Sequence, residues 1–418
     1  MERKKAFVTG GERGIGMTDK QIRLGRPVLE ARKDSVRLTS DLQMDGLKKL
    51  YFEVASDKKD YLASDRLDAF VIMVLRQALL TGSDIYCDAP VTSDLLYMLN
   101  ESLIPTLVRT IDRFHDVKVH AEPCAPCGGK EVITGYSGGV NSLYTLSRHH
   151  GKSTEGDEKA NLKLDGVACF DAGVYEETGE ARTRMYETAL SQTQKIASDL
   201  GLGCIGVRCN IQDIVDEHYL SVGSYRLIAC AMVISKRVGT FLYSGAYGFS
   251  VFSIDINNSF YYELLLADVF TTRAFRIYIS GGVQKRIEKI AYLAKQGPEI
   301  RRLLHVCVHD PLPGSRNCGV CSKCIRTELA MEGLGVLDLF SEAFPLDVYR
   351  QHHDEIVAKA NMASRNQHMA EAIEAMNASG FKITENIERK IRGGKAASAV
   401  INAHKEELLE KIKEKGLI

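Results

Sequence analysis

The feature that most constrains the fold of this chain is a regular alternation of short apolar runs and helix-like runs between residues 132 and 295. The β-prone runs occupy residues 132–136, 164–171, 204–208, 241–245 and 274–279. These runs are followed or separated by helix-like runs at residues 143–150, 181–200, 219–237 and 285–295. This alternation predicts an α/β fold with a doubly wound parallel sheet, in which ligands bind at the carboxyl ends of the strands.

The first strand-to-helix connection has the sequence Ser-Gly-Gly-Val-Asn-Ser at residues 137–142. A glycine-rich turn at the start of a helix directs backbone N–H groups toward an anion. The two adjacent glycines allow a phosphate to approach the backbone, and Ser137 and Ser142 add hydroxyl donors. The GK[ST] ending of a Walker A loop is missing. An ordinary Ser/Gly turn explains these six residues as well, so the rest of the chain must decide between the two interpretations.

A second motif is a cysteine cluster near residue 320. Cys318, Cys321 and Cys324 lie within seven residues, and Cys307 precedes them by eleven residues. Two CxxC steps that share a cysteine, with a fourth thiol, suit a closed tetrahedral Cys₄ zinc site with a structural role. An iron–sulfur cluster is the competing metal group, because thiolates also hold it. Disulfides are the remaining alternative, and they fit poorly in a chain with no visible secretory signal.

Together the two motifs resemble those of the PP-loop ATP pyrophosphatases, whose SGGxDS loop binds pyrophosphate. Within that superfamily the 7-cyano-7-deazaguanine synthases also carry a CxnCxxCxxC zinc site after the loop, and here the motifs have the same order, about 170 residues apart. The resemblance covers about residues 128–335 and implies an adenine nucleotide alpha hydrolase-like fold. It implies ATP, Mg²⁺ and Zn²⁺ as cofactors. It also implies adenylation of a small-molecule oxygen or carboxylate, followed by attack of a nitrogen or sulfur nucleophile.

The resemblance also implies site residues. The expected catalytic residues are Ser137, Asn141, Ser142, Asp171 and Arg286. The expected nucleotide-binding residues are Tyr136, Ser137, Gly138, Gly139, Val140, Asn141, Ser142, Asp171, Ala172, Gly173, Ser244 and Gly245. The expected metal ligands are Cys307, Cys318, Cys321 and Cys324.

Asn141 departs from the family pattern, which usually has Asp at this position. An amide keeps the hydrogen bonds of a carboxylate but loses the charge that helps to hold Mg²⁺. Asp171, at the end of the next strand, is the nearest candidate to supply the missing carboxylate. A helix N-cap explains Asp171 equally well, and a solvated helix charge explains Arg286.

Residues 1–127 are expected to form an α+β domain, with a hairpin over residues 35–54 and a helix over 65–80. Residues 5–16 resemble the glycine-rich start of a short-chain dehydrogenase, but Gly25 and Pro27 end any helix that would follow. Residues 1–16 are therefore expected to lie outside the native fold, with Met17 as an alternative start. Residues 128–335 form the expected PP-loop domain, and residues 336–418 a helical region with apolar positions at helical spacing. These positions are Ala397, Val400, Ile401, Leu408 and Ile412.

The composition of the chain limits the classes of partner that are expected. The formal net charge is zero, which disfavours a nucleic-acid substrate. No apolar run approaches the ~20 residues that span a bilayer, and no signal peptide is visible, so no membrane is expected. The eleven cysteines, seven of them outside the cluster, imply a reducing compartment, so a cytoplasmic location is expected. The expected partners are a small-molecule substrate and an ammonia or sulfur donor protein, and a homodimer remains open.

Two other functions remain open. Cys124 and Cys127 form a CxxC pair that could carry sulfur, which would suit a sulfur transferase acting on tRNA or on a thioamide product. Two ordinary linker cysteines are the simpler explanation of this pair. With Asn141 in place of Asp, the chain could also be a nucleotide-binding protein that is not an enzyme.

Overall fold

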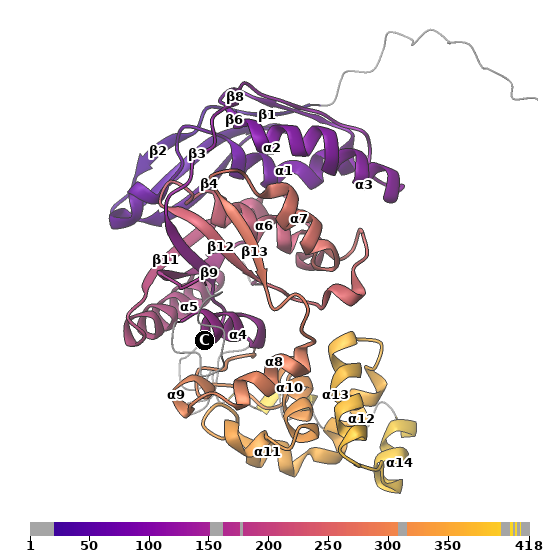
Figure 1. The fold of residues 1–418 in the computed structure, drawn as a ribbon. Coiled ribbons are helices and arrows are strands. Elements are labelled where there is room, and N and C mark those ends of the chain that lie inside the picture. Colours follow the sequence, from indigo (N-terminus) through magenta and orange to yellow (C-terminus); the bar gives the residue numbers. More distant parts are fainter. Residues whose placement is uncertain are drawn as a thin grey trace, which may run out of the picture.

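The computed structural model describes residues 21–150, 162–175, 179–307 and 316–393, together with residues 402, 403, 406, 407 and 410. The expectations for residues 1–16 and for the apolar positions between 397 and 412 lie outside these residues. Figure 1 shows the N-terminal strands at the top, the parallel strands in the middle and the C-terminal helices at the bottom. No helix of the described part is long and apolar enough to cross a membrane.

Five parallel strands form the part of the sheet that carries the glycine-rich loop. They are β9 (Glu131–Gly135), β10 (Gly166–Asp171), β11 (Gly203–Cys209), β12 (Val238–Ser244) and β13 (Arg276–Ser280). Their spatial order is β13-β12-β9-β10-β11. The chain runs from β9 through β10 to β11 on one side of β9, and then crosses to β12 and β13 on its other side. The strand order therefore reverses beside β9. The five strands correspond to the five apolar runs, and the prediction of a mainly parallel α/β sheet is confirmed.

The N-terminal strands extend the same sheet. They are β1 (Gln21–Leu24), β2 (Val28–Ala31), β3 (Ser35–Gln43), β4 (Leu47–Ala55), β5 (Asp84–Cys87) and β7 (Val119–His120). β3 and β4 form the predicted hairpin, and its turn contains Asp45 at φ 29° and Gly46 at φ 106°. β4 pairs antiparallel with β11, which joins the two groups of strands into one sheet. A separate small sheet consists of β6 (Val91–Thr92) and β8 (Pro123–Cys124).

Helices cover both faces of the parallel strands, and each face has its own hydrophobic core. The first core includes α1 (Asp68–Thr81), α2 (Ser93–Met98), α3 (Ile104–Thr110), α6 (Tyr219–Met232) and α7 (Glu263–Phe270). The second includes α4 (Val140–His149), α5 (Gly179–Asp199) and α8 (Arg286–Ala294). Ile133 and Phe241 point into the first core, whereas Val167 and Leu242 point into the second. A π-helical turn at Leu99–Leu103 separates α2 from α3, and Pro105 lies in the first turn of α3.

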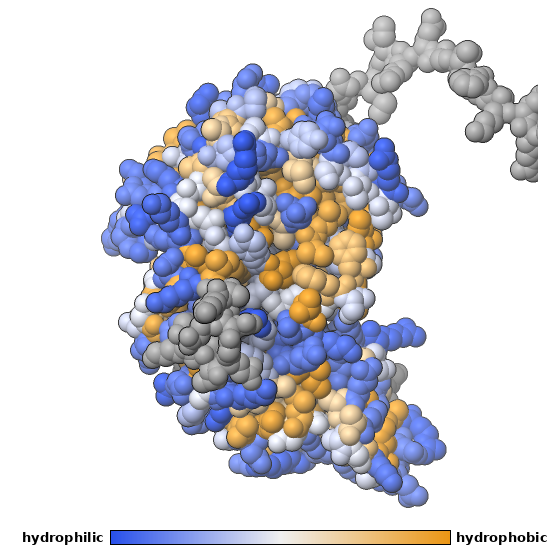
Figure 2. Space-filling view, in the orientation of Figure 1, coloured by the Kyte–Doolittle hydropathy of each residue, from blue (hydrophilic) through white to orange (hydrophobic). Residues whose placement is uncertain are grey.

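The C-terminal helices enlarge the second core. They are α9 (Pro298–Arg301), α10 (Ser322–Gly333), α11 (Leu346–Gln351), α12 (His353–Met362), α13 (Gln367–Ala378) and α14 (Glu385–Gly393). Short helical turns occupy Ser56–Tyr61, Ile211–Asp213, Phe249–Val251, Ser259–Tyr262 and Leu337–Phe340. α10 packs closely on α13, since a Cβ at Gly333 would lie 2.6 Å from the backbone of Ala375. Figure 2 shows a hydrophobic area over α6 and α7, whereas the surface near β2 and β3 is hydrophilic.

Candidate functional site

The glycine-rich loop connects the carboxyl end of β9 to the start of α4. Gly138 adopts φ 77°, and a Cβ there would lie 3.0 Å from the Cβ of His305, so this position requires glycine. Gly139 has an ordinary extended backbone at φ −69° and ψ 167°, and a Cβ there would meet only Ser137 Oγ, at 3.5 Å. Side-chain volume added at Gly139 would therefore not collide with the protein itself but would fill the space in front of the loop.

The two serines stabilise the loop from within. Ser137 Oγ lies 3.2 Å from Ser142 Oγ, and Ser142 Oγ is 3.1 Å from Gly139 O. The first N–H groups of a helix have no partner within the helix, so those of α4 are available to a ligand. His305 N–H donates to Gly138 O at 2.9 Å and attaches the segment that follows α9 to the loop.

The loop opens into a cavity of about 510 Å³. One part of its wall is mainly apolar and aromatic and comes from the parallel strands, α5 and α6. The residues of this wall include Ala168, Cys169, Phe170, Met185, Ile196, Tyr219, Phe241, Tyr243 and Phe260. The cavity is of the size of small-molecule sites, which usually combine an apolar wall with a few polar groups.

Four cationic side chains also line the cavity. They are Arg286 at the start of α8, Lys323 and Arg326 in the first turns of α10, and Arg316 between Cys307 and Cys318. Arg286 is 8% exposed, and the other three are half-buried. Burial, with Arg326 as a close like charge, lowers the pKa of Arg286. The cations are thus crowded together and removed from water, which is unfavourable unless an anion joins them.

Hydrogen-bonding atoms beside these cations also lack partners. Arg286 Nε, Arg326 Nε and His305 Nε2 are buried without a hydrogen-bond partner within the described residues. Burial and the nearby Arg316 and Lys323 lower the pKa of His305 to about 4, so its ring is neutral at pH 7. Buried polar atoms are nearly always hydrogen-bonded, so these atoms indicate a ligand that accepts hydrogen bonds.

Asn141 connects the loop to α8 and to the end of β12. Its Nδ2 donates to Ala246 O at 3.4 Å, and its Oδ1 accepts from Lys289 Nζ at 3.3 Å. Lys289 also donates to Gly245 O at 2.7 Å and is only 1% exposed. Burial lowers the pKa of Lys289 to about 8, and Glu263 opposes this shift. Asn141 and Ser244 line the cavity, whereas Lys289 and Gly245 lie behind its wall.

Asp171 lies elsewhere. It is fully buried at the end of β10, and neither it nor Ala172 or Gly173 lines the cavity. Its carboxylate lies 3.4 Å from Arg208 Nε and 3.6 Å from Arg182 Nε. Burial raises the pKa of Asp171, and these two guanidinium groups oppose the rise. The geometry therefore gives Asp171 two structural partners and no contact with the cavity, in contrast to the role expected from its position at a strand end.

The expected magnesium ion does not fit the residues of the cavity wall. Mg²⁺ in proteins is usually held by one or two carboxylates together with substrate phosphates. The described residues that line the cavity include neither Asp nor Glu. Neutral oxygens of Ser137, Asn141 and Ser142 are present, but none of the wall residues that the structure describes supplies a carboxylate.

The four cysteines of the cluster come together as predicted. Cys307, Cys318, Cys321 and Cys324 each offer a sulfur, and the four Sγ atoms lie within 4.8 Å of one another. Cys321 Sγ and Cys324 Sγ are 3.5 Å apart, and Cys318 Sγ and Cys324 Sγ 3.9 Å, too far for an S–S bond of about 2.05 Å. Four sulfurs about 2.3 Å from a central zinc ion would have similar separations. The cluster could therefore hold a metal ion such as zinc.

Two features of this centre were not found from the sequence. Asn317, which is fully buried, accepts from the Val306 and Cys307 N–H groups and donates to Leu304 O and Ala343 O. It thereby holds the segment that carries Cys307 beside the other ligands. The residues between and after the clustered cysteines, Lys323 and Arg326, point into the cavity. The cysteine spacing of this segment predicts a metal site and does not indicate that these two cations line the cavity.

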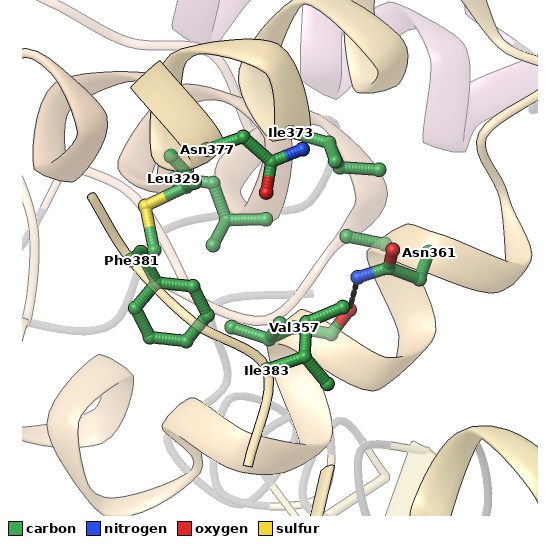
Figure 3. A pocket seen from close by; sticks show the side chains of 9 residues that line it. Leu329, Val357, Asn361, Ile373, Asn377, Phe381 and Ile383 are labelled. Carbon is green, nitrogen blue, oxygen red and sulfur yellow. Dashed lines mark hydrogen bonds between the residues drawn. The ribbon is translucent and has the colours of Figure 1, made fainter. Parts of the chain in front are cut away.

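The CxxC pair lies away from the cavity. Cys124 belongs to β8, whose partner strand contains Thr92, and neither Cys124 nor Cys127 lines the cavity. A further small pocket lies between α10, α12 and α13 and is drawn in Figure 3, with Leu329, Val357 and Phe381 among its walls. Its volume of about 10 Å³ is room for no more than one water molecule.

No protein-family model, curated protein or solved structure matches this chain. Function must therefore be inferred from the residues and geometry of the site.

Proposed function

We propose that this protein is an ATP-dependent enzyme of the PP-loop ATP pyrophosphatase type, built on a doubly wound sheet. The observation that carries the proposal is the position of loop 137–142. It lies at the carboxyl end of β9, beside the reversal of strand order, and opens into a cavity with four cations on its wall. Open α/β sheets bind ligands at such a reversal.

The two parts of the cavity wall suit the two parts of a nucleotide. Phe170, Phe241 and their apolar neighbours suit an adenine ring, which stacks on aromatic side chains. Loop N–H groups, Arg286 and Arg326 suit phosphate oxygens, since guanidinium groups bind these in bidentate fashion. The loop lines the same cavity, and its N–H groups would bind the α-phosphate.

In the proposed reaction, an oxygen of a small substrate attacks the α-phosphorus, the bond to the β-phosphate oxygen breaks, and pyrophosphate leaves. A nitrogen or sulfur nucleophile then attacks the adenylated substrate, and AMP leaves with its oxygen. The cations would stabilise the charge that develops on the departing pyrophosphate. Cys169 lines the cavity, but burial raises its pKa to about 12, so it is a thiol rather than a thiolate nucleophile. We propose that the protein positions the reactants instead of forming a covalent intermediate.

No observation favours the alternative of sulfur transfer through Cys124 and Cys127, because neither residue lines the cavity. A nucleotide-binding protein without catalysis would share the same loop and cations. The two functions differ in whether AMP and pyrophosphate are released. Incubation with ATP and a small-molecule extract, followed by mass spectrometry of AMP and adenylated species, separates them.

The loop assignment predicts that Gly139→Val combined with Ser137→Ala abolishes ATP binding while the fold is retained. The valine side chain would fill the space in front of the loop, and the backbone of Gly139 is one that valine adopts without strain. Isothermal titration with ATP measures the loss, and thermal unfolding checks the fold. Gly393→Val, at an open position at the end of α14, is the matched control. Unchanged ATP affinity in the folded double variant would show that the loop does not bind the nucleotide.

A further inference from the structure

The cavity wall has an unusual charge balance for a nucleotide site. Among its described residues, Arg286, Arg316, Lys323 and Arg326 are cationic and none is acidic. A metal ion at the cysteine cluster would be one source of negative charge, because a divalent ion with four thiolates has a net charge of roughly −2. Glu371 adds another, since its carboxylate accepts from Arg286 N–H at 3.1 Å. Apart from the half-buried Cys307, the groups that carry these charges do not line the cavity. Arg286 Nε and Arg326 Nε remain buried without hydrogen-bond partners among the described residues.

The family pattern places a carboxylate at position 141, and this chain places an amide there. The amide is committed to Ala246 O and Lys289, so it completes the loop instead of facing an ion. Asp171, the other carboxylate expected here, is enclosed by Arg182 and Arg208. Among its described residues, the cavity wall therefore lacks the carboxylate of the family pattern and carries four cationic side chains.

Building on the proposed function, we infer that this cavity binds a polyphosphate directly through Arg286, Arg316, Lys323 and Arg326, in place of a magnesium ion held by the protein. The ligand class is the free polyphosphate of a nucleotide, with the full negative charge of its phosphates. A bound Mg²⁺ would neutralise two of those charges and weaken their attraction to the cations. The site therefore favours free ATP over the magnesium complex.

The test compares binding of two probes, inorganic tripolyphosphate and ATP, with and without millimolar Mg²⁺. Buffers are freed of magnesium on a chelating resin rather than with a soluble chelator, and elemental analysis confirms that the metal of the cysteine cluster is retained. We expect each Kd without Mg²⁺ to be lower than with it, by up to about tenfold. Binding that is equal or weaker without Mg²⁺ overturns the inference, as does no binding of tripolyphosphate in either condition.

The two probes separate this inference from the proposed function. If tripolyphosphate binds without Mg²⁺ but ATP does not, the polyphosphate site stands and the ATP-dependent function fails. If ATP binds and is cleaved only with Mg²⁺, the function stands and the inference fails.

Single substitutions test which side chains bind the polyphosphate. Arg326→Gln is expected to weaken tripolyphosphate binding about tenfold or more, and Arg326→Lys to recover part of the loss, because it restores the charge but not the fork of donors. Arg392→Gln is the control, since Arg392 is exposed on α14 and outside the cavity. Lys323→Gln is the second variant if Arg326→Gln does not fold. Unchanged affinity in the folded variants would overturn the assignment.

Discussion

At the scale of single residues, Asp171 shows how burial changes the role that a strand-end position suggests. It lies where ligands gather in parallel sheets, yet its carboxylate faces Arg182 and Arg208 beneath the surface. Asn141, by contrast, lines the cavity and bridges three elements through one amide. An aspartate there could accept from Lys289 but could not donate to Ala246 O. The amide is therefore the side chain that suits both neighbours.

We predict that Asp171→Asn destabilises the fold by about 2–3 kcal/mol, because it removes the buried carboxylate that Arg182 and the half-buried Arg208 both face. Arg182 keeps its ion pair with Asp213 in this variant. Urea denaturation measures the change. The loss is expected to be smaller in an Arg182→Met background, where one of the two guanidinium groups that face this carboxylate is already missing. Normal stability with reduced turnover per folded molecule would instead indicate a catalytic role for Asp171.

At the scale of elements, the cysteine cluster and α10 form one unit. Cys321 is the N-cap of α10 and accepts from Cys324 N–H at 3.5 Å. Lys323 and Arg326, in the first turns of the same helix, face the cavity. A metal ion at the cluster would therefore fix both the helix start and the direction of these two cations.

We predict that the purified protein contains about one zinc ion per chain and that Cys324→Ser removes it and destabilises the second core. Metal-binding energy contributes to folding in such sites, and Cys324 is fully buried. Elemental analysis and thermal unfolding measure both effects, with Cys204→Ser as a control outside the cluster. Because Lys323 and Arg326 depend on the same helix, metal loss should also weaken tripolyphosphate binding. Iron at the site, or full stability without metal, would contradict the prediction.

At the scale of the whole molecule, the continuous sheet makes the N-terminal and middle parts of the chain depend on each other. β4 pairs with β11 through Glu53 opposite Arg208, and Asn210 exchanges hydrogen bonds with the backbone of Tyr51 and Lys49. α1 and α6 share one hydrophobic core. The domain boundary expected at residue 127 stays a prediction. Strands on both sides of this boundary belong to the same sheet.

We predict that a chain beginning at residue 128 does not fold to a soluble monomer, because β11 would become an exposed edge and α6 would lose its cover. Circular dichroism and size-exclusion chromatography test this. A chain beginning at Met17 is the control, since residues 1–16 are expected to lie outside the native fold. A soluble, cooperatively unfolding 128–418 chain would show that the middle part is an independent domain.

The sequence by itself determined the local features of this protein. Short apolar runs and helical patterns located the five parallel strands and most of the helices between them, because such patterns depend on neighbours within one element. The glycines of loop 137–142 and the spacing of the four cysteines were also recognisable, since backbone geometry and thiol chemistry restrict these positions to few residue types.

Only the tertiary structure decided which side chains share the cavity. Arg316, Lys323 and Arg326 come from segments about 180 residues beyond the loop, and nothing in their local pattern distinguishes them from solvated charges. The enclosure of Asp171 and the contact of Lys289 with Asn141 depend on how α5, β11 and α8 pack against neighbouring strands and helices. Such contacts arise when distant segments are buried together, and the free energy of that burial is a property of the packed molecule rather than of any one segment.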